Sequence, residues 1–285
     1  KRQSQYLSGV LLAAPLAHAP LTVHIGGKNV VSWPYVALTL QALETFGVPF
    51  AVERLEDGVW SVIDWRTLEQ AEPGRVRFRM EPAVYRAGRY AVEGDWSGAS
   101  YFLAAGAIGP RPVRMEGLRA ESLQGDRVML DILRDMGARI DVEADAVTVH
   151  PSALHGVDMD MGRCPDLVPT VAVVAAHASG PTRVRNAAHL RIKECDRIAV
   201  PAAELAKVGV RSEEHEDGLT VYGDPDLASR LGSLEGIAFS AHGDHRIAMS
   251  LALLELRGGR LALDNPSCVG KSFPNFWECW DQVRS

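Results

Sequence analysis

The chain has 285 residues, of which 47% are hydrophobic and 23% are charged, and its formal net charge is −6. This composition is typical of a globular protein with one large core or two ordinary ones, and it excludes a largely disordered chain. The acidic balance disfavours general nucleic-acid binding, which needs a basic surface, so any anion site must be local.

The first apolar stretch, Tyr6 to Val23, is interrupted by Pro15, His18 and Pro20. It therefore falls short of the roughly 20 uninterrupted apolar residues that a membrane helix requires. The chain opens on Lys1 rather than Met and has no signal-sequence pattern, which suggests a cut or processed piece of a longer protein. The four cysteines have no C-x-x-C spacing, and this favours free thiols in a reducing cytoplasm.

Three amphipathic stretches each end in a glycine that is typical of a left-handed helix stop. These glycines are Gly47, Gly137 and Gly209. Each is followed by a pattern that predicts strands. The predicted strands are residues 50–55 and 59–64, then 139–143 and 146–150, and finally 219–222.

Three further helices are apolar almost all round, and each follows an aspartate: Asp95, Asp166 and Asp244. An aspartate suits a helix start, where it accepts hydrogen bonds from backbone N–H groups, and an apolar surround indicates a buried helix. Residues 5–19, with a strand at 21–25, resemble a further copy without its beginning. The sequence thus predicts an α/β unit of about 70 to 90 residues used about three and a half times, in internally symmetric domains.

The segment LRIKECDR, Leu190 to Arg197, concentrates two arginines, a lysine, a glutamate and an aspartate. Such a cluster is either a solvated surface or a site that holds an anion and moves a proton. Two later segments, GDHR from Gly243 and GKSFP from Gly270, each place a cation beside a glycine or a helix start. Three separated cationic points favour one shared polyanionic ligand.

Taken together, these segments resemble the 3-phosphoshikimate 1-carboxyvinyltransferases, or EPSP synthases. The matching segments follow one another over nearly the whole chain: SQYLSGVLLAAPLA, VSWPYVALTLQALETFGV, VEGDWSGASYFLAAGAIG, LQGD, CPD, LRIKECDRI, GDHRIAM and GKSFPNFW. The resemblance implies a two-domain inside-out α/β enolpyruvyl transferase fold built from repeated βαβαββ units, here incomplete. It makes residues 1–93 the carboxy-terminal part of the first (inserted) domain and residues 94–285 a nearly complete second domain.

The implied reaction transfers the enolpyruvyl group of phosphoenolpyruvate to the 5-hydroxyl of 3-phosphoshikimate by addition and elimination. It needs two acid/base groups and several fixed cations, and no cofactor or metal. By resemblance, Asp166 is the base at the substrate hydroxyl, and Glu194 handles the proton of the methylene carbon. Since Lys193 and Arg197 beside Glu194 would lower its pKa, we expect burial to offset them if it donates a proton. On sequence alone, Asp166 would be a helix cap, whereas a surface ion pair is the weaker alternative for Glu194.

The resemblance also assigns the residues that bind the two substrates. Arginine forks and a lysine suit the carboxylate and phosphate of phosphoenolpyruvate, and the assigned residues are Gln5, Arg197, Arg246 and Lys271. Those assigned to 3-phosphoshikimate are Gln3, Ser4, Gln5, Ser32, Asp166, His189 and Lys193. Gln3 and His189 depart from the family's usual serine and asparagine, but both can hydrogen-bond. Residues expected to cap helices or orient these groups are Tyr35, Asp95, Asp126, Arg191 and Asp196.

Several alternatives remain. A nucleotide-sugar enolpyruvyl transferase shares the fold but lacks the SQYLS and KECDR pattern. An inactive fragment that binds only part of the ligand is also possible, because the resemblance implies that an amino-terminal segment with site residues is missing. A metal site at His242, Asp244 and His245 is disfavoured because no fourth ligand is evident. We expect a monomer whose partners are its two substrates and the missing segment, with no membrane or nucleic-acid partner.

Overall fold

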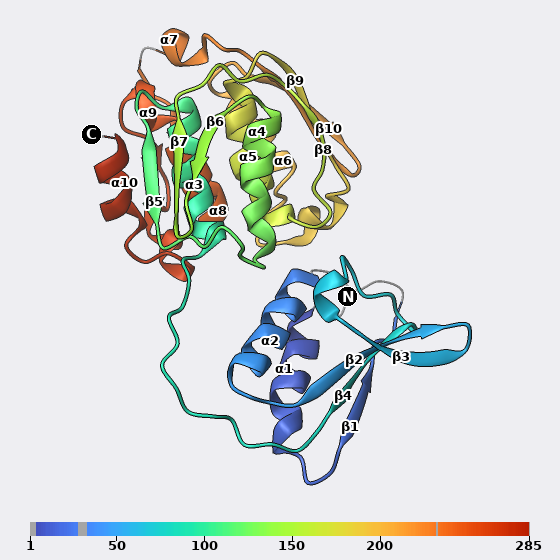
Figure 1. The fold of residues 1–285 in the computed structure, drawn as a ribbon. Helices are drawn as coiled ribbons and strands as arrows, with labels where there is room; N and C mark the ends of the chain where they lie inside the picture. Colours follow the sequence, from blue (N-terminus) through green and yellow to red (C-terminus); the bar gives the residue numbers. More distant parts are fainter. Residues whose placement is uncertain (1–3, 28–32, 232, 285) are drawn as a thin grey trace. The chain divides into compact units, whose positions relative to one another are not determined.

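The computed structural model describes residues 4–27, 33–231 and 233–284. The chain divides into two compact units (Figure 1). Unit 1 comprises Lys1–Val92 and Leu123–Gly125, and unit 2 comprises Glu93–Ser122 and Asp126–Ser285. Within the described ranges, no helix is long and apolar enough to cross a membrane.

Unit 1 consists of an antiparallel sheet and two main helices that pack on each other (Figure 1). The helices are α1 (Ser4–Ala13), continued by the 3-10 turn η1 (Ala14–Leu16), and α2 (Trp33–Thr45). The strands, in sheet order, are β1 (Leu21–His24), β4 (Val76–Met80), β2 (Phe50–Glu56) and β3 (Val59–Ile63), and a 3-10 turn η2 (Trp65–Thr67) follows β3. Leu11, Leu40 and Phe78 join helices and sheet in one core.

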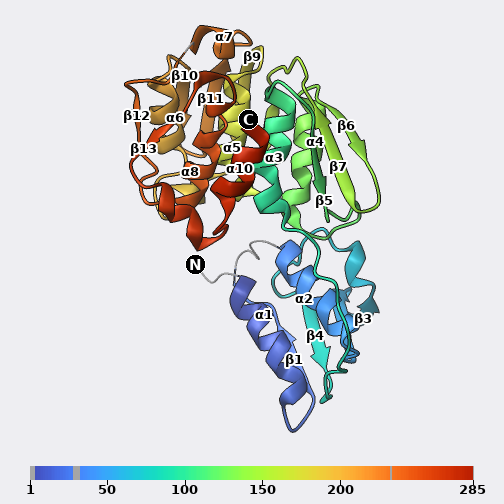
Figure 2. The same ribbon diagram turned by 90° about the vertical axis from the view of Figure 1, so that its left-hand side faces the viewer.

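Three buried helices form the centre of unit 2: α3 (Trp96–Ile108), α5 (Val168–Ala176) and α8 (His245–Ala252). Every residue of α3 and α5 is buried, as their apolar sequences predict. Both helices lie between the two larger sheets of the unit (Figure 2). At Gly106 of α3, a Cβ would lie 2.7 Å from the carbonyl oxygen of Val149, so this close approach of helix and sheet requires glycine.

The first of these sheets is antiparallel, with the order β5 (Val113–Glu116), β7 (Ala146–His150) and β6 (Arg139–Val142). The second has the order β10 (Arg211–His215), β11 (Gly218–Gly223), β9 (Gly180–Arg185) and β8 (Asp158–Asp160), and only its β8–β9 pair is parallel. A short parallel pair joins β12 (Ala238–Phe239) to β13 (Ala262–Leu263). The outer helices are α4 (Met129–Asp135), α6 (Ala199–Ala206), α7 (Leu227–Leu231), α9 (Glu255–Gly258) and α10 (Phe276–Arg284).

The α/β class and the order of helix, glycine stop and hairpin agree with the sequence. Gly47, Gly137 and Gly209 have φ angles of 72°, 98° and 76°, which are the left-handed conformations predicted for them. The predicted strands overlap β2, β3, β6, β7 and β11. The predicted helix 5–19 is shorter: α1 ends at Ala13 and becomes a 3-10 turn, because Pro15 lacks the N–H that would continue the helix.

The aspartates that precede the three buried helices do not all serve as caps. Asp95 accepts hydrogen bonds from the backbone N–H groups of Ser97 and Gly98, and Asp244 accepts one from Arg246. Asp166 instead lies inside the 3-10 turn η4 (Pro165–Leu167), and no side chain caps the start of α5. The helix-cap interpretation of Asp166 is therefore wrong, because its carboxylate is bound by arginines.

Candidate functional site

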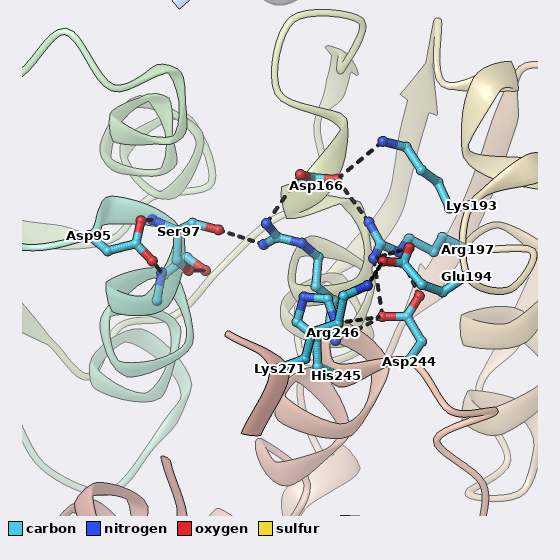
Figure 3. Close-up of polar contacts among 12 residues, drawn as sticks. Asp95, Ser97, Asp166, Lys193, Glu194, Arg197, Asp244, His245, Arg246 and Lys271 are labelled. Atoms are coloured by element: carbon cyan, nitrogen blue, oxygen red, sulfur yellow. Dashed lines mark hydrogen bonds and ion pairs between the residues drawn. The ribbon is translucent and has the colours of Figure 1, made fainter. Parts of the chain in front are cut away.

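The starts of four helices meet at one cluster of charged side chains in unit 2 (Figure 3). Asp166 lies in the 3-10 turn η4, two residues before the first residue of α5, and Arg197 lies two residues before the first residue of α6. Arg246 lies in the first turn of α8, and Ser97 lies in the first turn of α3. Helix starts carry partial positive charge and free N–H groups, which favour anions. The sequence therefore brings fixed dipoles and cations to the same place.

Arg197 is the most buried cation of this cluster, with a side chain that is 2% exposed. Its Nε donates to Asp244 Oδ2 at 2.7 Å and its Nη2 to Asp244 Oδ1 at 3.1 Å, a two-pronged contact that fixes the plane of the guanidinium. Nη1 donates to Asp166 Oδ1 at 2.8 Å, and Nη2 also donates to Glu194 Oε2 at 2.9 Å. Arg197 thus joins both predicted acid/base groups.

Arg246 approaches Asp166 from the other side. Its Nη2 lies 3.1 Å from Asp166 Oδ2, and its Nη1 donates to Ser97 Oγ. A third cation, Lys193, has its Nζ 3.9 Å from Asp166 Oδ1. The Asp166 carboxylate therefore faces three cations, as the close-up shows (Figure 3).

Glu194 receives hydrogen bonds from Lys271 and from Arg197. Burial opposes its ionisation, but the hydrogen bond from Lys271 and the charge of Arg197 outweigh burial and lower the pKa of Glu194 to about 2. The sequence-based expectation that burial offsets the neighbouring cations is therefore wrong, because the pKa-lowering contacts outweigh burial. Glu194 is therefore a carboxylate at neutral pH, paired with two cations.

Two further ionisable groups interact with Arg246. Burial raises the pKa of Asp126 to about 6, although the charge of Arg246 opposes the shift. Burial also raises the pKa of Tyr101 to about 12. For Arg246 itself, burial disfavours the charge, but Tyr101, Asp166 and Asp126 outweigh it and raise its pKa. Arg246 is therefore a permanent cation that interacts with Asp126, Asp166 and Tyr101.

The three residues considered for a metal do not point at a common centre. Asp244 is bound by Arg197 and by the start of α8, whereas His242 Nε2 lies 3.4 Å from Glu204 Oε1. Burial and the charge of Arg246 lower the pKa of His245. Among the described residues, no group of three or more His, Cys, Asp or Glu side chains could hold a metal ion.

The structure brings together the predicted residues Asp166, Lys193, Glu194, Arg197, Arg246 and Lys271. His189 lies half-buried on the 3-10 turn η5 (Ala188–Ile192), four residues before Lys193. Gln5 is exposed on α1 in unit 1, and Ser4 begins that helix. Gln3 and Ser32, together with the side chain of Ser4, lie outside the described part of the chain.

Sequence reasoning missed Ser97, the partner of Arg246, and missed that Asp244 binds Arg197. Ser97 follows the cap residue Asp95 by two positions, which is the one hint that it faces a helix start. Asp196 fits its predicted orienting role, because it accepts hydrogen bonds from the N–H groups of Ile198 and Ala199 and also one from Arg191.

Comparison with known proteins identifies relatives of the chain. Residues 67–280 match the family model of EPSP synthase (3-phosphoshikimate 1-carboxyvinyltransferase). A 3-phosphoshikimate 1-carboxyvinyltransferase of Syntrophobacter fumaroxidans is 39% identical over 286 residues, which cover 100% of this chain and 62% of the relative. One from Methanococcoides burtonii is 39% identical and covers 99% of this chain and 60% of its own length. The chain thus spans about three fifths of the length of these relatives.

Solved structures of similar fold include EPSP synthase from Acinetobacter baumannii. It superimposes with a TM-score of 0.75 at 24% identity and covers 99% of this chain and 60% of its own. The enolpyruvyl transferase NikO from Streptomyces tendae gives a TM-score of 0.72 at 23% identity, with coverages of 98% and 59%. These likenesses confirm the enolpyruvyl transferase fold expected from the sequence.

Proposed function

Since this chain belongs to the EPSP synthase family, we propose that it forms the larger part of a 3-phosphoshikimate 1-carboxyvinyltransferase. The enzyme transfers the enolpyruvyl group of phosphoenolpyruvate to the 5-hydroxyl of 3-phosphoshikimate, giving 5-enolpyruvylshikimate 3-phosphate and phosphate. The supporting observation is the convergence of Arg197, Arg246 and Lys271 around two carboxylates, Asp166 and Glu194. A ligand with a carboxylate and a phosphate needs several fixed cations, and addition followed by elimination needs two proton-exchanging groups.

In this proposal Asp166 accepts the proton of the 5-hydroxyl as its oxygen attacks the central carbon of phosphoenolpyruvate. Glu194 gives a proton to the terminal methylene carbon, which becomes a methyl group. In the elimination, Glu194 takes a proton back from that methyl group as the double bond forms again, and the departing phosphate takes the proton held by Asp166, so that both carboxyl groups return to their initial states. Arg197 contacts both carboxylates, so it can hold the donor between them.

The same geometry provides a way for substrate binding to raise the low pKa of Glu194. Lys271 is the largest of the cationic influences that lower this pKa, and it is itself a proposed ligand of phosphoenolpyruvate. When an anionic ligand takes the ammonium of Lys271, Glu194 loses that hydrogen bond and its pKa rises. Binding of the donor would thereby prepare the acid that protonates it.

The remaining binding assignments are also proposals. Gln5 joins Arg197, Arg246 and Lys271 in binding phosphoenolpyruvate. The contacts of 3-phosphoshikimate come from Gln3, Ser4, Gln5, Ser32, Asp166, His189 and Lys193. Residues 1–93 form the carboxy-terminal part of the first domain and 94–285 the second domain, which fits the change of unit at residues 92 and 93. The protein works as a cytoplasmic monomer without a metal or cofactor.

The proposed activity is tested with the full-length gene product. Phosphate release from phosphoenolpyruvate should require 3-phosphoshikimate, and the organic product should carry the enolpyruvyl ether, as observed by ³¹P and ¹H NMR. Asp166→Asn should lower kcat by roughly 10²-fold or more, the usual contribution of a general base. No phosphate release by the unaltered protein would refute the proposed function, and an unchanged kcat in Asp166→Asn would refute the role of Asp166.

A second possibility is that the 285-residue chain by itself binds phosphoenolpyruvate without turning it over. The observation in its favour is that the chain spans only about three fifths of its relatives, while the whole charged cluster lies in unit 2. Calorimetry with phosphoenolpyruvate and a parallel assay of turnover separate binding from catalysis. Turnover at the rate of the full-length gene product would contradict this proposal.

A further inference from the structure

A tight turn, Ser240 to Gly243, precedes the residue that holds Arg197. His242 and Gly243 both adopt left-handed conformations, with φ angles of 51° and 69°. Such a conformation is unfavourable for histidine, so the surrounding structure must maintain it. The turn closes with a hydrogen bond of 2.8 Å from the N–H of Asp244 to the carbonyl of Ala241.

Glu204, in the last turn of α6, contacts this turn although it is distant from it in sequence. Its side chain is 3% exposed. Oε2 accepts hydrogen bonds from the N–H of Ser240 at 3.0 Å and from Lys207 Nζ at 2.7 Å, and Oε1 lies 3.4 Å from His242 Nε2. A buried carboxylate is costly unless it is paired in this way, so its contacts define one position for the turn.

Asp264, which follows β13, holds the other side of the same turn. Its Oδ1 accepts from the N–H of Ala241 at 2.8 Å, and its Oδ2 accepts from Ser240 Oγ. Ser240 Oγ in turn accepts from the N–H of His242 at 3.1 Å. The turn is therefore clamped between Glu204 and Asp264, and the clamp includes the strained residue itself.

Asp244 leaves this clamped turn with a fully buried side chain. It accepts two hydrogen bonds from Arg197 and one from the backbone N–H of Arg246. Arg197 lies two residues before α6, the helix that carries Glu204 in its last turn. Two residues of the segment from Arg197 to Glu204 therefore contact the turn region. Arg197 contacts Asp244, which directly follows the turn, and Glu204 contacts Ser240 and His242 within it.

We propose that Glu204 is a positioning residue, which holds the turn Ser240 to Gly243 and thereby fixes Asp244 and the guanidinium of Arg197. Its importance for phosphoenolpyruvate rests on the proposed function. Its effect on the geometry of Arg197 does not, and that effect can be measured without turnover. The side-chain partners of Glu204 within the described part of the chain are Lys207, Ser240 and His242, so its influence on Arg197 passes through the turn.

The test is the exchange rate of the Arg197 Nε–H proton with solvent, followed by ¹⁵N NMR in the full-length gene product. Arg197→Lys, which removes this signal, identifies it. Glu204→Gln removes the charge that pairs with Lys207 and faces His242, so the exchange of the Arg197 proton should accelerate about tenfold, the effect of losing about one hydrogen bond. The KM for phosphoenolpyruvate should rise about as much, and more than the KM for 3-phosphoshikimate.

Glu255→Gln is the matched control. Glu255 is nearly as buried, at 8% side-chain exposure, and likewise accepts a backbone hydrogen bond, from Leu261, and a side-chain hydrogen bond, from Trp280. It should lower thermal stability without changing the exchange of the Arg197 proton. Equal acceleration in both variants, or none in Glu204→Gln, would overturn the proposal.

If Glu204→Gln does not fold, Asp264→Ala tests whether the turn fixes Arg197, because Asp264 is exposed and holds the other side of the same turn. It removes both hydrogen bonds of Asp264 to the turn and should accelerate the same exchange. An unchanged rate in that variant would also overturn the proposal. Absence of phosphate release by the unaltered protein, with the exchange rates as expected, would refute the proposed function and leave the role of Glu204 in place.

Discussion

Lys271 controls the protonation of Glu194, because its hydrogen bond is the largest of the influences that lower the pKa of Glu194 to about 2. Lys271→Met should therefore raise this pKa, measured by ¹³C NMR of the labelled carboxyl group, and should raise the KM for phosphoenolpyruvate by roughly tenfold or more, as expected on removal of a charged contact. Lys193→Met is the control, since Lys193 contacts Asp166 rather than Glu194. A pKa that stays near 2 in Lys271→Met would contradict this account.

Asp126 gives the protein a dependence of stability on pH. Because burial raises the pKa of this carboxyl to about 6 in the folded chain, against 3.8 as its ordinary value, the protonated form stabilises the fold. That contribution is complete below the unfolded value and is lost as the pH rises through about 6. Asp126→Asn cannot ionise, so its stability lacks this loss. As the pH rises between the two pKa values, the free energy of unfolding of the variant should increase relative to that of the unaltered protein by up to roughly 1.4 kcal/mol per pH unit. Denaturant titrations at several pH values measure this, and a constant difference across that range would contradict it.

The sequence identified residues of the charged cluster wherever they stand in a dense segment, as Glu194 and Arg197 do. It could not show that Asp166 does not cap a helix. The Asp166 carboxylate is instead bound by Arg197 and Arg246, which lie 31 and 80 positions later in the chain. Ser97 was missed, since apart from its spacing from Asp95 a serine at the start of a buried helix looks like any small residue there. The pKa of Glu194 could not be predicted from the sequence either, because it depends on the balance between burial, which raises it, and hydrogen bonds, which lower it.

The contact between helix α3 and strand β7 depends on the absence of a side chain at Gly106. Gly106→Ala would place its Cβ 2.7 Å from the carbonyl oxygen of Val149 and should destabilise unit 2 by about 1 to 3 kcal/mol, since backbone on both sides must move. Gly9→Ala in α1 is the control, because nothing lies within 4 Å of the position that its Cβ would take, and it should stabilise by about 0.5 to 1 kcal/mol. Calorimetric unfolding of both variants checks this, and equal effects would refute it.

Strand β4 shows which features of a strand can be predicted from the sequence and which cannot. Val76, Phe78 and Met80 are buried and alternate with Arg77 and Arg79, which is a strand pattern of period two that the sequence contains. Its pairing with both β1 and β2 was not predictable, because the position of a strand in a sheet depends on partners distant in the chain. The glycine stops were predictable, since a left-handed residue is a local requirement.

At the scale of the whole molecule, the charged cluster lies within one compact unit, and the segment that joins the two units contributes no residue to it. All residues of the charged cluster belong to unit 2, and each of the two units has its own buried core. Residues 81–95, which run from the end of the first long segment of unit 1 into unit 2, form neither helix nor strand. The N–H of Arg86 still bonds the carbonyl of Phe46 in unit 1, and that of Gly94 bonds Gly117 in unit 2.

Limited proteolysis tests this organisation. Trypsin should cut first after Arg89, which is exposed and lies between those two anchoring bonds, while Arg54 should resist because it is paired within β2. The change Arg89→Gln should remove this early cut, as mass spectrometry of the fragments would reveal. Because the fragment from Tyr90 onward keeps every cation of the cluster, it should bind inorganic phosphate about as tightly as the intact chain. A first cut within a helix or strand of either unit would contradict this prediction, and loss of phosphate binding by that fragment would mean that the cluster depends on residues 1–89 for its structure.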